Sequence, residues 1–534
     1  MPTVSEVLAS TLRDAGVDTV FGLPGGENAE VLDALRRSGI DFVLVRNENS
    51  AVFMADATAR LTGRPGVALA TLGPGATNAY CAMAHAYLDR SPVVLVTAQS
   101  DRRILGRYTH QVIDLQSSFT PITKMTAELT ATDTLRTVEQ ALRVAVSDRP
   151  GPVHLGVSAH MATQEVEPST AVEAAPGVRA SAPVGDLEGA ARFLAAAERP
   201  VILAGLGLEP EKPYDALRRL AERAQTPVIT SPKAKGAIPA DHPLSVGTIG
   251  LTGADAAYQI LEEADCIVAI GFDVVEMESL WEQRQPIIWV APWTNEDPVL
   301  PFMEHEVVGP ITPSLDRLAE AEFTPTPGWG GERVRAFRRD LASLHLPEAA
   351  NGRIQPQSLL AILRKHLPRE AVVTTDTGSH KICTALVWPT YEPNTYLLSN
   401  GLSTMGIGLP AAIAASRVTG AVSLCITGDG GMAMVLGELG LLRDLNVPVI
   451  VVVMNDNALD LIRSGQIRRG KPVYGTEFVN PDYQAVAHAF GLDYFRASDE
   501  ASATEAIQRA VPSRRPTVIE ALIDPASYPT TPAR

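Results

Sequence analysis

The sequence predicts an α/β protein with three doubly wound domains whose sheets are mostly parallel, and three observations lead to this prediction. The chain has 534 residues, too many for a single hydrophobic core. Short, continuously apolar runs alternate with longer helical patterns, which is typical of parallel strands covered by helices on both faces. Two segments rich in Pro, Gly and Thr, 163–183 and 323–332, show no such period and separate three blocks.

Each block contains several of the apolar runs. The expected strands begin at Val67, Pro92 and Pro152 in the first block, at Pro200, Pro227 and Cys266 in the second, and at Ala371, Ala421, Val447 and Thr517 in the third. Alternation of such strands with helices indicates a sheet covered on both faces. We therefore expect an N-terminal domain at 1–165, a middle domain at 184–322 and a C-terminal domain at 345–534.

Composition and charge exclude several classes of protein. Hydrophobic residues make up 46% and charged residues 20% of the chain, as in an ordinary globular protein. The net charge of -16 disfavours nucleic acid and anionic membranes as partners. The four cysteines lie far apart without CxxC spacing, and no run reaches the roughly 18 apolar residues of a membrane span. Because the N-terminus lacks a basic start and an apolar signal core, we expect a cytoplasmic protein with reduced thiols.

Polar residues follow two neighbouring strands of the third block. Gly-Asp-Gly-Gly comes after the strand that begins at Ala421, and Asn-Asp-Asn comes after the next. Ligands of doubly wound sheets bind at the carboxyl ends of such strands. Gly428, Gly430 and Gly431 let an anion approach the backbone amides, and Asp429 and Asp456 offer the oxygen ligands that magnesium prefers beside phosphates. The pattern indicates a divalent cation that holds a diphosphate, although an isolated Gly-Asp-Gly is more often only a tight turn.

Further segments carry a resemblance to a known family. They are "FGLPGGENAEVLDAL", "LVRNENSAVFMADATARLTGRPGVALATLGPGATN", "VTTDTGSHK" and "GLSTMGIGLPAAIAAS". Together with the Gly-Asp-Gly signature, they resemble thiamin-diphosphate enzymes, most closely acetohydroxyacid (acetolactate) synthase large subunits and relatives such as carboxyethylarginine synthase. The resemblance implies thiamin diphosphate and Mg²⁺ as cofactors. It also implies that the first domain binds the pyrimidine end of the cofactor and the third its diphosphate.

The resemblance also assigns site residues. Glu48 matches the glutamate that activates the cofactor by bonding its aminopyrimidine; without the flanking match it would be interpreted as a residue that complements a helix dipole. The Asp429 and Asp456 side chains and the Ala458 carbonyl match the metal ligands, although the family usually has Asn where Asp456 stands. The other implied contacts are Thr377, Gly378, Ser379 and His380 at the diphosphate, the Ser403 carbonyl and Met405 at the pyrimidine end, and Leu461 and Ile462 as apolar walls.

Substrate choice is expected to depend on the segment "YTHQVIDLQSSFTPITK". It aligns with the family segment that carries an active-site Gln, so we expect His110 to transfer a proton after decarboxylation and Gln111 to position the second substrate. The His-Gln pair is typical of the carboxyethylarginine synthase branch, whereas acetohydroxyacid synthases usually have Phe-Gln. Residues 463–476, with their glycines, are expected to form a loop that closes the site.

The middle domain departs from the flavin-dependent synthases. In place of their Arg-Phe-Asp-Asp-Arg segment it has "GFDVVEMESLW", and "AGLGLEP" stands at the glycine-rich turn. We therefore do not expect bound FAD, while a vestigial or different nucleotide site stays open.

Four functions stay open at this point. The leading one is decarboxylation of a 2-oxo acid with carboligation, as in acetolactate synthase. The alternatives are a simple decarboxylase of the benzoylformate or pyruvate decarboxylase type or a specialised-metabolism ligase, and, remotely, a non-catalytic paralogue, which the intact Glu48 and Asp429 disfavour. The partners are then a small 2-oxo acid and an acceptor. Because the family's site lies between two chains, the resemblance also implies a homodimer or a dimer of dimers (homotetramer).

Overall fold

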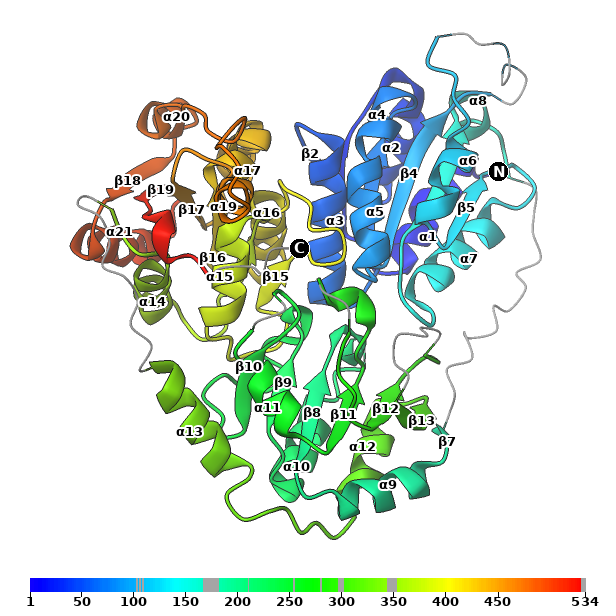
Figure 1. Cartoon of the computed structure of the whole chain (residues 1–534). Coiled ribbons are helices and arrows are strands. Elements are labelled where there is room, and N and C mark those ends of the chain that lie inside the picture. Colours follow the sequence, from blue (N-terminus) through cyan, green and yellow to red (C-terminus); the bar gives the residue numbers. More distant parts are fainter. Residues whose placement is uncertain are drawn as a thin grey trace. The chain divides into compact units, whose positions relative to one another are not determined.

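The protein consists of three sheets flanked by helices. The computed structural model describes residues 1–101, 104, 107, 110–166, 182–209, 211–252, 255–278, 281–295, 302–342 and 353–529. Within these ranges, two sheets have six strands and one has seven. The predicted α/β class with three doubly wound, mostly parallel sheets is confirmed (Figure 1).

The chain divides into two compact units. The first unit comprises Met1–Val178, Leu402–Gly420 and Val435–Asn446, and the second comprises Arg179–Gly401, Ala421–Met434 and Val447–Arg534. The second unit therefore contains both the middle and the third sheet, and two segments late in the chain belong to the first unit. The domain limits expected from the sequence stay a prediction.

The first sheet is wholly parallel, in the order β2-β1-β3-β4-β6-β5. Its strands are β1 (Thr19–Leu23), β2 (Asp41–Leu44), β3 (Gly66–Ala70), β4 (Val93–Gln99), β5 (Met125–Glu128) and β6 (Val153–Ser158). Its helices are α1 (Val4–Asp14), α2 (Ala29–Arg37), α3 (Glu48–Thr62), α4 (Pro74–Asn78), α5 (Tyr80–Leu88), α6 (Leu115–Phe119), α7 (Thr134–Val146) and α8 (Ala159–Ala162).

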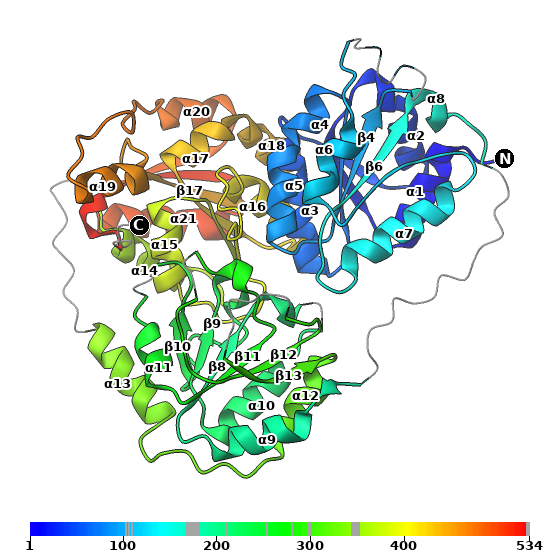
Figure 2. The ribbon, with the colours of Figure 1, turned by 45° about the vertical axis from the view of Figure 1, so that its right-hand side comes forward.

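Helix α3 is the central helix of this unit. Asn47 caps it by accepting from the Asn49 amide at 2.9 Å, and Gly63 ends it in the left-handed conformation that glycine favours. Helix α16 (Gly408–Thr419), rich in small residues, packs along α3 (Figure 2). Glu438, just before α18 (Leu439–Asp444), accepts from the Arg46 amide at 3.0 Å. Both late segments of the unit are thus anchored near α3, one along the helix and one just before its start.

A buried histidine joins three strands of the first sheet. His154 on β6 lies with Nε2 2.8 Å from Thr97 Oγ1 on β4 and Nδ1 2.9 Å from Thr126 Oγ1 on β5. Its ring stacks on Phe119, with 4.5 Å between centroids. Burial lowers the pKa of His154 to about 3. The ring is therefore neutral, with one nitrogen donating and the other accepting.

This neutral ring predicts a loss of stability in mild acid. The pKa of His154 falls from 6.5 to about 3 on folding, so only the unfolded chain binds a proton between these values. The contribution of His154 to the free energy of unfolding is fully present above about pH 6.5. It is lost as the pH falls towards 3, by about 1.4 kcal/mol per pH unit. Thermal unfolding compared at about pH 7 and about pH 5 measures it. His154→Gln is expected to weaken the acid dependence, and an unchanged dependence in that variant would contradict the assignment.

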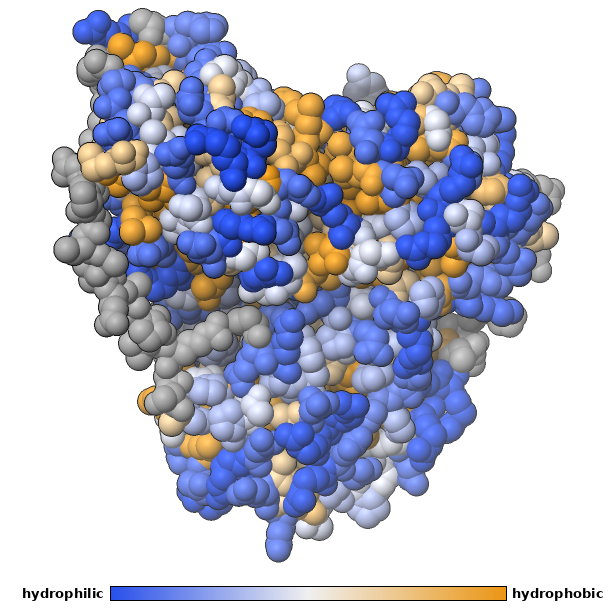
Figure 3. Space-filling model, turned by 180° about the vertical axis from the view of Figure 1, so that it is seen from behind, coloured by the Kyte–Doolittle hydropathy of each residue, from blue (hydrophilic) through white to orange (hydrophobic). Residues whose placement is uncertain are grey.

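The middle sheet is parallel apart from one edge strand. Its order is β10-β9-β8-β11-β12-β13-β7, with β7 antiparallel to β13. Its strands are β7 (Val184–Gly185), β8 (Pro200–Ala204), β9 (Val228–Thr230), β10 (Ser245–Thr248), β11 (Cys266–Ile270), β12 (Ile287–Ala291) and β13 (Met303–Val308). Its helices are α9 (Leu187–Ala196), α10 (Tyr214–Ala224), α11 (Tyr258–Glu263), α12 (Ile311–Ala319) and α13 (Gly331–Ala342). Figure 3 shows one face of the part of the chain built around this sheet, in the lower part of the view, and hydrophilic residues predominate there.

The third sheet is wholly parallel, in the order β15-β14-β16-β17-β19-β18. Its strands are β14 (Val372–Thr375), β15 (Tyr396–Leu398), β16 (Ser423–Gly428), β17 (Val449–Asn455), β18 (Asp493–Ala497) and β19 (Thr517–Leu522). Its helices are α14 (Pro356–His366), α15 (Ser379–Val387), α17 (Asp429–Met434), α19 (Asp460–Arg468), α20 (Tyr483–Ala489) and α21 (Glu500–Ser513).

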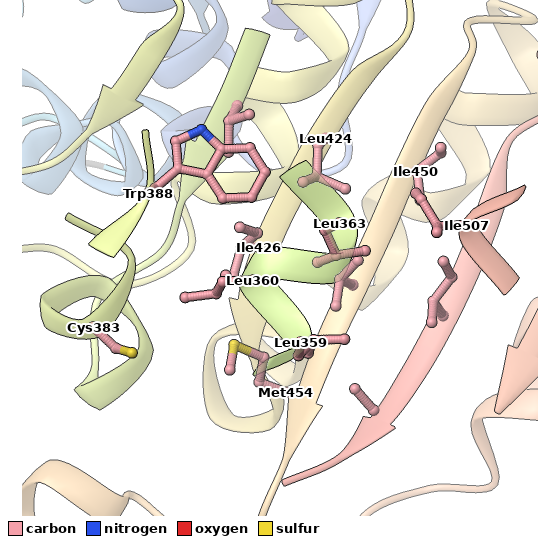
Figure 4. Close-up of a cluster of buried hydrophobic side chains, with 14 of the residues drawn as sticks. Leu359, Leu360, Leu363, Cys383, Trp388, Leu424, Ile426, Ile450, Met454 and Ile507 are labelled. Carbon is pink, nitrogen blue, oxygen red and sulfur yellow. The ribbon is translucent and has the colours of Figure 1, made fainter. Parts of the chain in front are cut away.

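One apolar cluster supports the third sheet. Side chains from α14, such as Leu359 and Leu363, interdigitate with Leu424 and Ile426 of β16 and with Ile450 of β17 (Figure 4). All five are almost fully buried, and each contributes roughly 1.5–3 kcal/mol through the apolar surface it removes from water. This core fixes the ends of β16 and β17, which carry the expected metal ligands. No helix in the described ranges is long and apolar enough to cross a membrane.

Candidate cofactor-binding and active site

The expected catalytic glutamate lies at the beginning of α3. Glu48 is the first residue of that helix and only 4% exposed. Its Oε2 accepts from Asn78 Nδ2 at 3.0 Å, and this amide comes from the end of α4. The hydrogen bond fixes the orientation of the carboxylate.

A glycine turn lies against this carboxylate. A β-carbon added to Gly75 would lie 3.1 Å from Glu48 Oε1 and 2.8 Å from Thr71 Cγ2. Gly73 has a φ of +57°, and a β-carbon there would lie 3.0 Å from Gln111 Cβ. Larger residues would therefore displace Glu48 or Gln111. One turn thus brings the two expected site residues together.

The other expected residues of this unit lie on two further segments, one at His110 and Gln111 and one at Ser403 and Met405. His110 is exposed in a turn next to Gln111, which is half-buried with a φ of 60°. Several residues just before them, 102–103, 105–106 and 108–109, lie outside the described part of the chain. Ser403 has a φ of 52°, and Thr404 Oγ1 beside it lies 3.3 Å from Cys81 Sγ. The roles of His110, Ser403 and Met405 stay predictions.

The expected metal ligand Asp429 connects two strand ends of the second unit. It begins α17 directly after β16 and is 2% exposed. Its Oδ1 accepts from Gly430 N at 2.8 Å, while Oδ2 accepts from Asn457 N at 2.8 Å and from Asn480 Nδ2 at 2.7 Å. Burial raises the pKa of Asp429, which these donors counteract.

The second carboxylate is close by, at the end of β17. Asp456 is 9% exposed, and its Oδ1 accepts from Ala458 N at 3.1 Å. Burial, then the charges of Asp429 and Asp460, raise the pKa of Asp456 to about 7, against the opposing charge of Arg463. A divalent cation bound beside these clustered carboxylates would offset their negative charge.

His380 connects the two glycine turns of this unit. Its Nε2 accepts from Gly428 N at 3.1 Å. β-Carbons added to Gly378 or Gly428 would lie 2.7 and 2.8 Å from its Cε1, so both glycines are required for the close approach. Burial lowers the pKa of His380 to about 4, and the ring is neutral. The ring thus joins the loops after β14 and β16, and its expected contact with a phosphate stays a prediction.

Asp376 organises the start of the same loop. Its Oδ1 accepts from Thr377 N at 2.8 Å and its Oδ2 from Thr427 Oγ1 at 3.2 Å. A β-carbon on Gly431 would lie 2.6 Å from Asp376 Oδ2. Gly428 and Gly431, which are expected to let an anion approach the backbone, therefore also leave room for the side chains of His380 and Asp376.

The segment after the metal turn differs from the expected loop. Residues 463–468 continue α19, which begins at Asp460, so the closing loop predicted at 463–476 is wrong in its first part. The Asp460 carboxylate accepts from Ser379 Oγ at 2.8 Å and from Arg463 at 3.0 Å. Of the expected apolar walls, Leu461 packs on the core cluster and Ile462 is 54% exposed; their contact with a cofactor stays a prediction.

Family models and curated relatives agree on what the chain resembles. Residues 2–118 match the thiamine pyrophosphate enzyme N-terminal TPP binding domain, 187–318 the central domain and 376–521 the C-terminal TPP binding domain. A probable acetolactate synthase large subunit of Methanocaldococcus jannaschii is 31% identical over 98% of this chain and 92% of its own length. The chain belongs to the acetolactate synthase large-subunit family. The large subunit of acetolactate synthase isozyme 1 of Escherichia coli is also 31% identical, over 99% of this chain and 96% of its own length. An acetolactate synthase of Bacillus subtilis is 29% identical over 97% and 93%.

Membership of this family identifies the protein as a thiamin-diphosphate-dependent enzyme of the acetolactate synthase type. The donor set after β16 and β17 fits a magnesium diphosphate. In the described residues, no group of three or more His, Cys, Asp or Glu side chains is arranged to hold a metal ion. A cation bound here would take two carboxylates and a carbonyl from the protein and share the phosphates of the cofactor, as magnesium commonly does.

Three residues that hydrogen-bond to expected site residues are not among those predicted from the sequence. Asn78 holds Glu48, Asn480 holds Asp429 and Asp460 holds Ser379. Asn78 lies in the segment that carried the resemblance, and Asp460 begins the helix after the metal turn, so local signals existed for both. Asn480 lies on a distant loop, and no local pattern points to it.

Proposed function

We propose that this protein decarboxylates pyruvate or a similar 2-oxo acid and ligates the remaining two-carbon unit to a second 2-oxo acid, with Mg²⁺ and thiamin diphosphate as cofactors. The observation that carries the proposal is the Glu48 carboxylate, buried and oriented by Asn78 at the start of a helix. Membership of the acetolactate synthase family supports the ligation outcome over simple decarboxylation.

The residues expected at the two ends of the cofactor would supply different functions. Asp429, Asp456 and the Ala458 carbonyl would hold the metal and with it the diphosphate. Bound thiamin diphosphate supplies the electron sink for decarboxylation. Glu48 would hydrogen-bond its aminopyrimidine and control one proton there. The apolar surroundings of such a site would exclude water from the reacting carbon.

The second substrate would be positioned from the Gly73–Gly75 turn. Gln111 lies against this turn, whose Gly75 lies against Glu48, and its amide would bind the carboxylate or carbonyl of the acceptor. His110, next to it, is the candidate for proton transfer after decarboxylation. We further propose a homodimer as the smallest active assembly, since the family's site is completed by two chains.

The products of the reaction show which acceptor the enzyme uses. Purified protein with magnesium, thiamin diphosphate and pyruvate is expected to form acetolactate, and added 2-oxobutanoate is expected to give the mixed acetohydroxy acid, both seen by NMR. His110→Ala is expected to reduce ligation at least about tenfold, with the exposed His160→Ala as matched control. Acetaldehyde as the only product would contradict the ligase assignment and support the decarboxylase alternative.

A further inference from the structure

The middle sheet has a topological switch point that no residue of the proposed mechanism uses. Its strand order reverses between β8 and β11, and doubly wound sheets bind nucleotides in the crevice at this switch point. Glycine-containing loops follow both strands, with Gly205 and Gly207 after β8 and Gly271 after β11. A flavin dinucleotide is the ligand that the family resemblance would imply here.

The two glycine loops are hydrogen-bonded to each other. Gly205 N donates to Ile270 O at 3.0 Å, and Gly207 N donates to Gly271 O at 2.7 Å. A β-carbon on Gly271 would lie 2.7 Å from the Gly207 carbonyl carbon, and one on Gly207 would lie 2.8 Å from Trp293 Cη2. The Gly205 and Gly207 amides, which would face a diphosphate, therefore donate to carbonyls of the protein itself. The space beside Gly207 and Gly271 is filled by backbone atoms and by the Trp293 indole.

Glu276 accepts hydrogen bonds from further donors of these loops and of the loop after β9. This side chain ends the short helix η5 (Val274–Glu276) and is 1% exposed. Its Oε2 accepts from Leu206 N at 2.9 Å and from Asp273 N at 3.3 Å, and its Oε1 accepts from the Ser231 hydroxyl. The Asp273 contact belongs to the capping box of η5, but the other two come from the loops after β8 and β9. A β-carbon on Gly205 would lie 2.6 Å from Oε2.

The segment that carries Glu276 also contacts the diphosphate-binding part of the same unit. The Glu276 carbonyl accepts from Asn400 Nδ2 at 2.5 Å. Two residues on, Glu278 pairs with the buried Lys381 ammonium at 2.5 Å. Lys381 follows His380 directly on α15, so this pair fixes the helix that begins with the expected diphosphate contacts.

We infer that Glu276 occupies the position of a dinucleotide's diphosphate, so that the middle domain binds no flavin, and that the anchored segment Asp273–Glu278 positions α15 instead. The residues of the crevice thus do not fit FAD, because its phosphate donors are used by Glu276 and by the loops themselves. The second half of the inference rests on the proposed function, since it concerns the diphosphate helix.

Flavin binding tests the first half. Purified full-length protein, incubated with excess FAD and then filtered, is expected to retain no flavin absorbance, and added FAD is expected to leave the melting temperature unchanged. Glu276→Gln is expected to behave in the same way, because the amide fills the same space. Stoichiometric retention of FAD by the wild-type protein would overturn the inference.

Cofactor affinity tests the second half. Glu278→Gln and Lys381→Met are each expected to weaken thiamin diphosphate binding at least about threefold, and the double variant no more than either single one. The exposed Glu282→Gln is the matched control and is expected to bind as the wild type does. Lys381→Arg is expected to restore part of the affinity. Binding is measured by calorimetry on protein shown to be folded by circular dichroism.

The outcomes separate this inference from the proposed function. Wild-type affinity in both Glu278→Gln and Lys381→Met would contradict the positioning role while leaving the proposed function intact. A wild-type protein that binds no thiamin diphosphate would contradict the proposed function itself.

Discussion

Glu48→Gln is expected to give a folded protein that binds thiamin diphosphate and magnesium but turns over pyruvate at least about 100-fold more slowly, the range seen when general acid–base groups are removed. The amide keeps the volume of the side chain and can still bond to Asn78, so packing at the start of α3 is preserved. What it loses is the ability to control a proton on the aminopyrimidine. Steady-state kinetics and cofactor titration on the same preparation separate the two effects.

Glu30→Gln is the matched control. Glu30 also lies in the first turn of a helix of the same unit, α2, but its side chain is exposed. Its variant is expected to have wild-type turnover, because it removes only an interaction with the helix dipole. Turnover near the wild-type level in Glu48→Gln would show that Glu48 has only that dipole role, and the assignment would fail.

Asp429→Asn is expected to weaken the binding of magnesium and thiamin diphosphate at least about 100-fold, because even changes outside the ligand shell of metal sites cost about 10–100-fold. Asp429 accepts three hydrogen bonds that hold the turns after β16 and β17 together. The amide can replace only part of them, and it removes the negative charge that a cation needs. Titration of the cofactor at several magnesium concentrations measures the loss.

Asp456→Asn is the matched variant with the opposite expectation. It restores the residue that the family usually has, and an amide oxygen is also a ligand for magnesium, so affinity is expected to stay within about threefold of the wild type. It also removes one of the clustered carboxylates beside Asp429 and Asp460. Equal losses in both variants would contradict the assignment of Asp429 as the principal ligand.

Much of the fold was predictable because the central strands are buried on both faces. β4, β16 and β17 are mostly apolar and fully buried, and the composition of each predicts a strand. The edge strands β2, β5 and β18 are partly exposed and have no such run, so their pattern was too weak. β12 is different, because its sequence "IIWVA" is an apolar, fully buried run of the kind that indicates a strand, although it is not among the strands expected above.

The sequence pattern predicts closeness where residues follow neighbouring strands of one sheet. Asp429 and Asp456 follow neighbouring strands, and this spacing was enough to expect them together. The bonds from Asn480 and from Ser379 to Asp460 depend on tertiary packing between distant segments. Glycine and arginine in residues 463–468 favour a loop, but these residues are helical. The helix begins with Asp460 in its first turn, where a carboxylate is favourable.

The most direct test of the central claim is the ratio of pyruvate consumed to carbon dioxide released by the purified protein with magnesium and thiamin diphosphate. Ligation to acetolactate consumes two pyruvates for each carbon dioxide, whereas simple decarboxylation consumes one. The account predicts the first ratio, with acetolactate accounting for the carbon and with both rates lost in Glu48→Gln. A ratio of one, or a Glu48→Gln variant that consumes pyruvate at the wild-type rate, would contradict it.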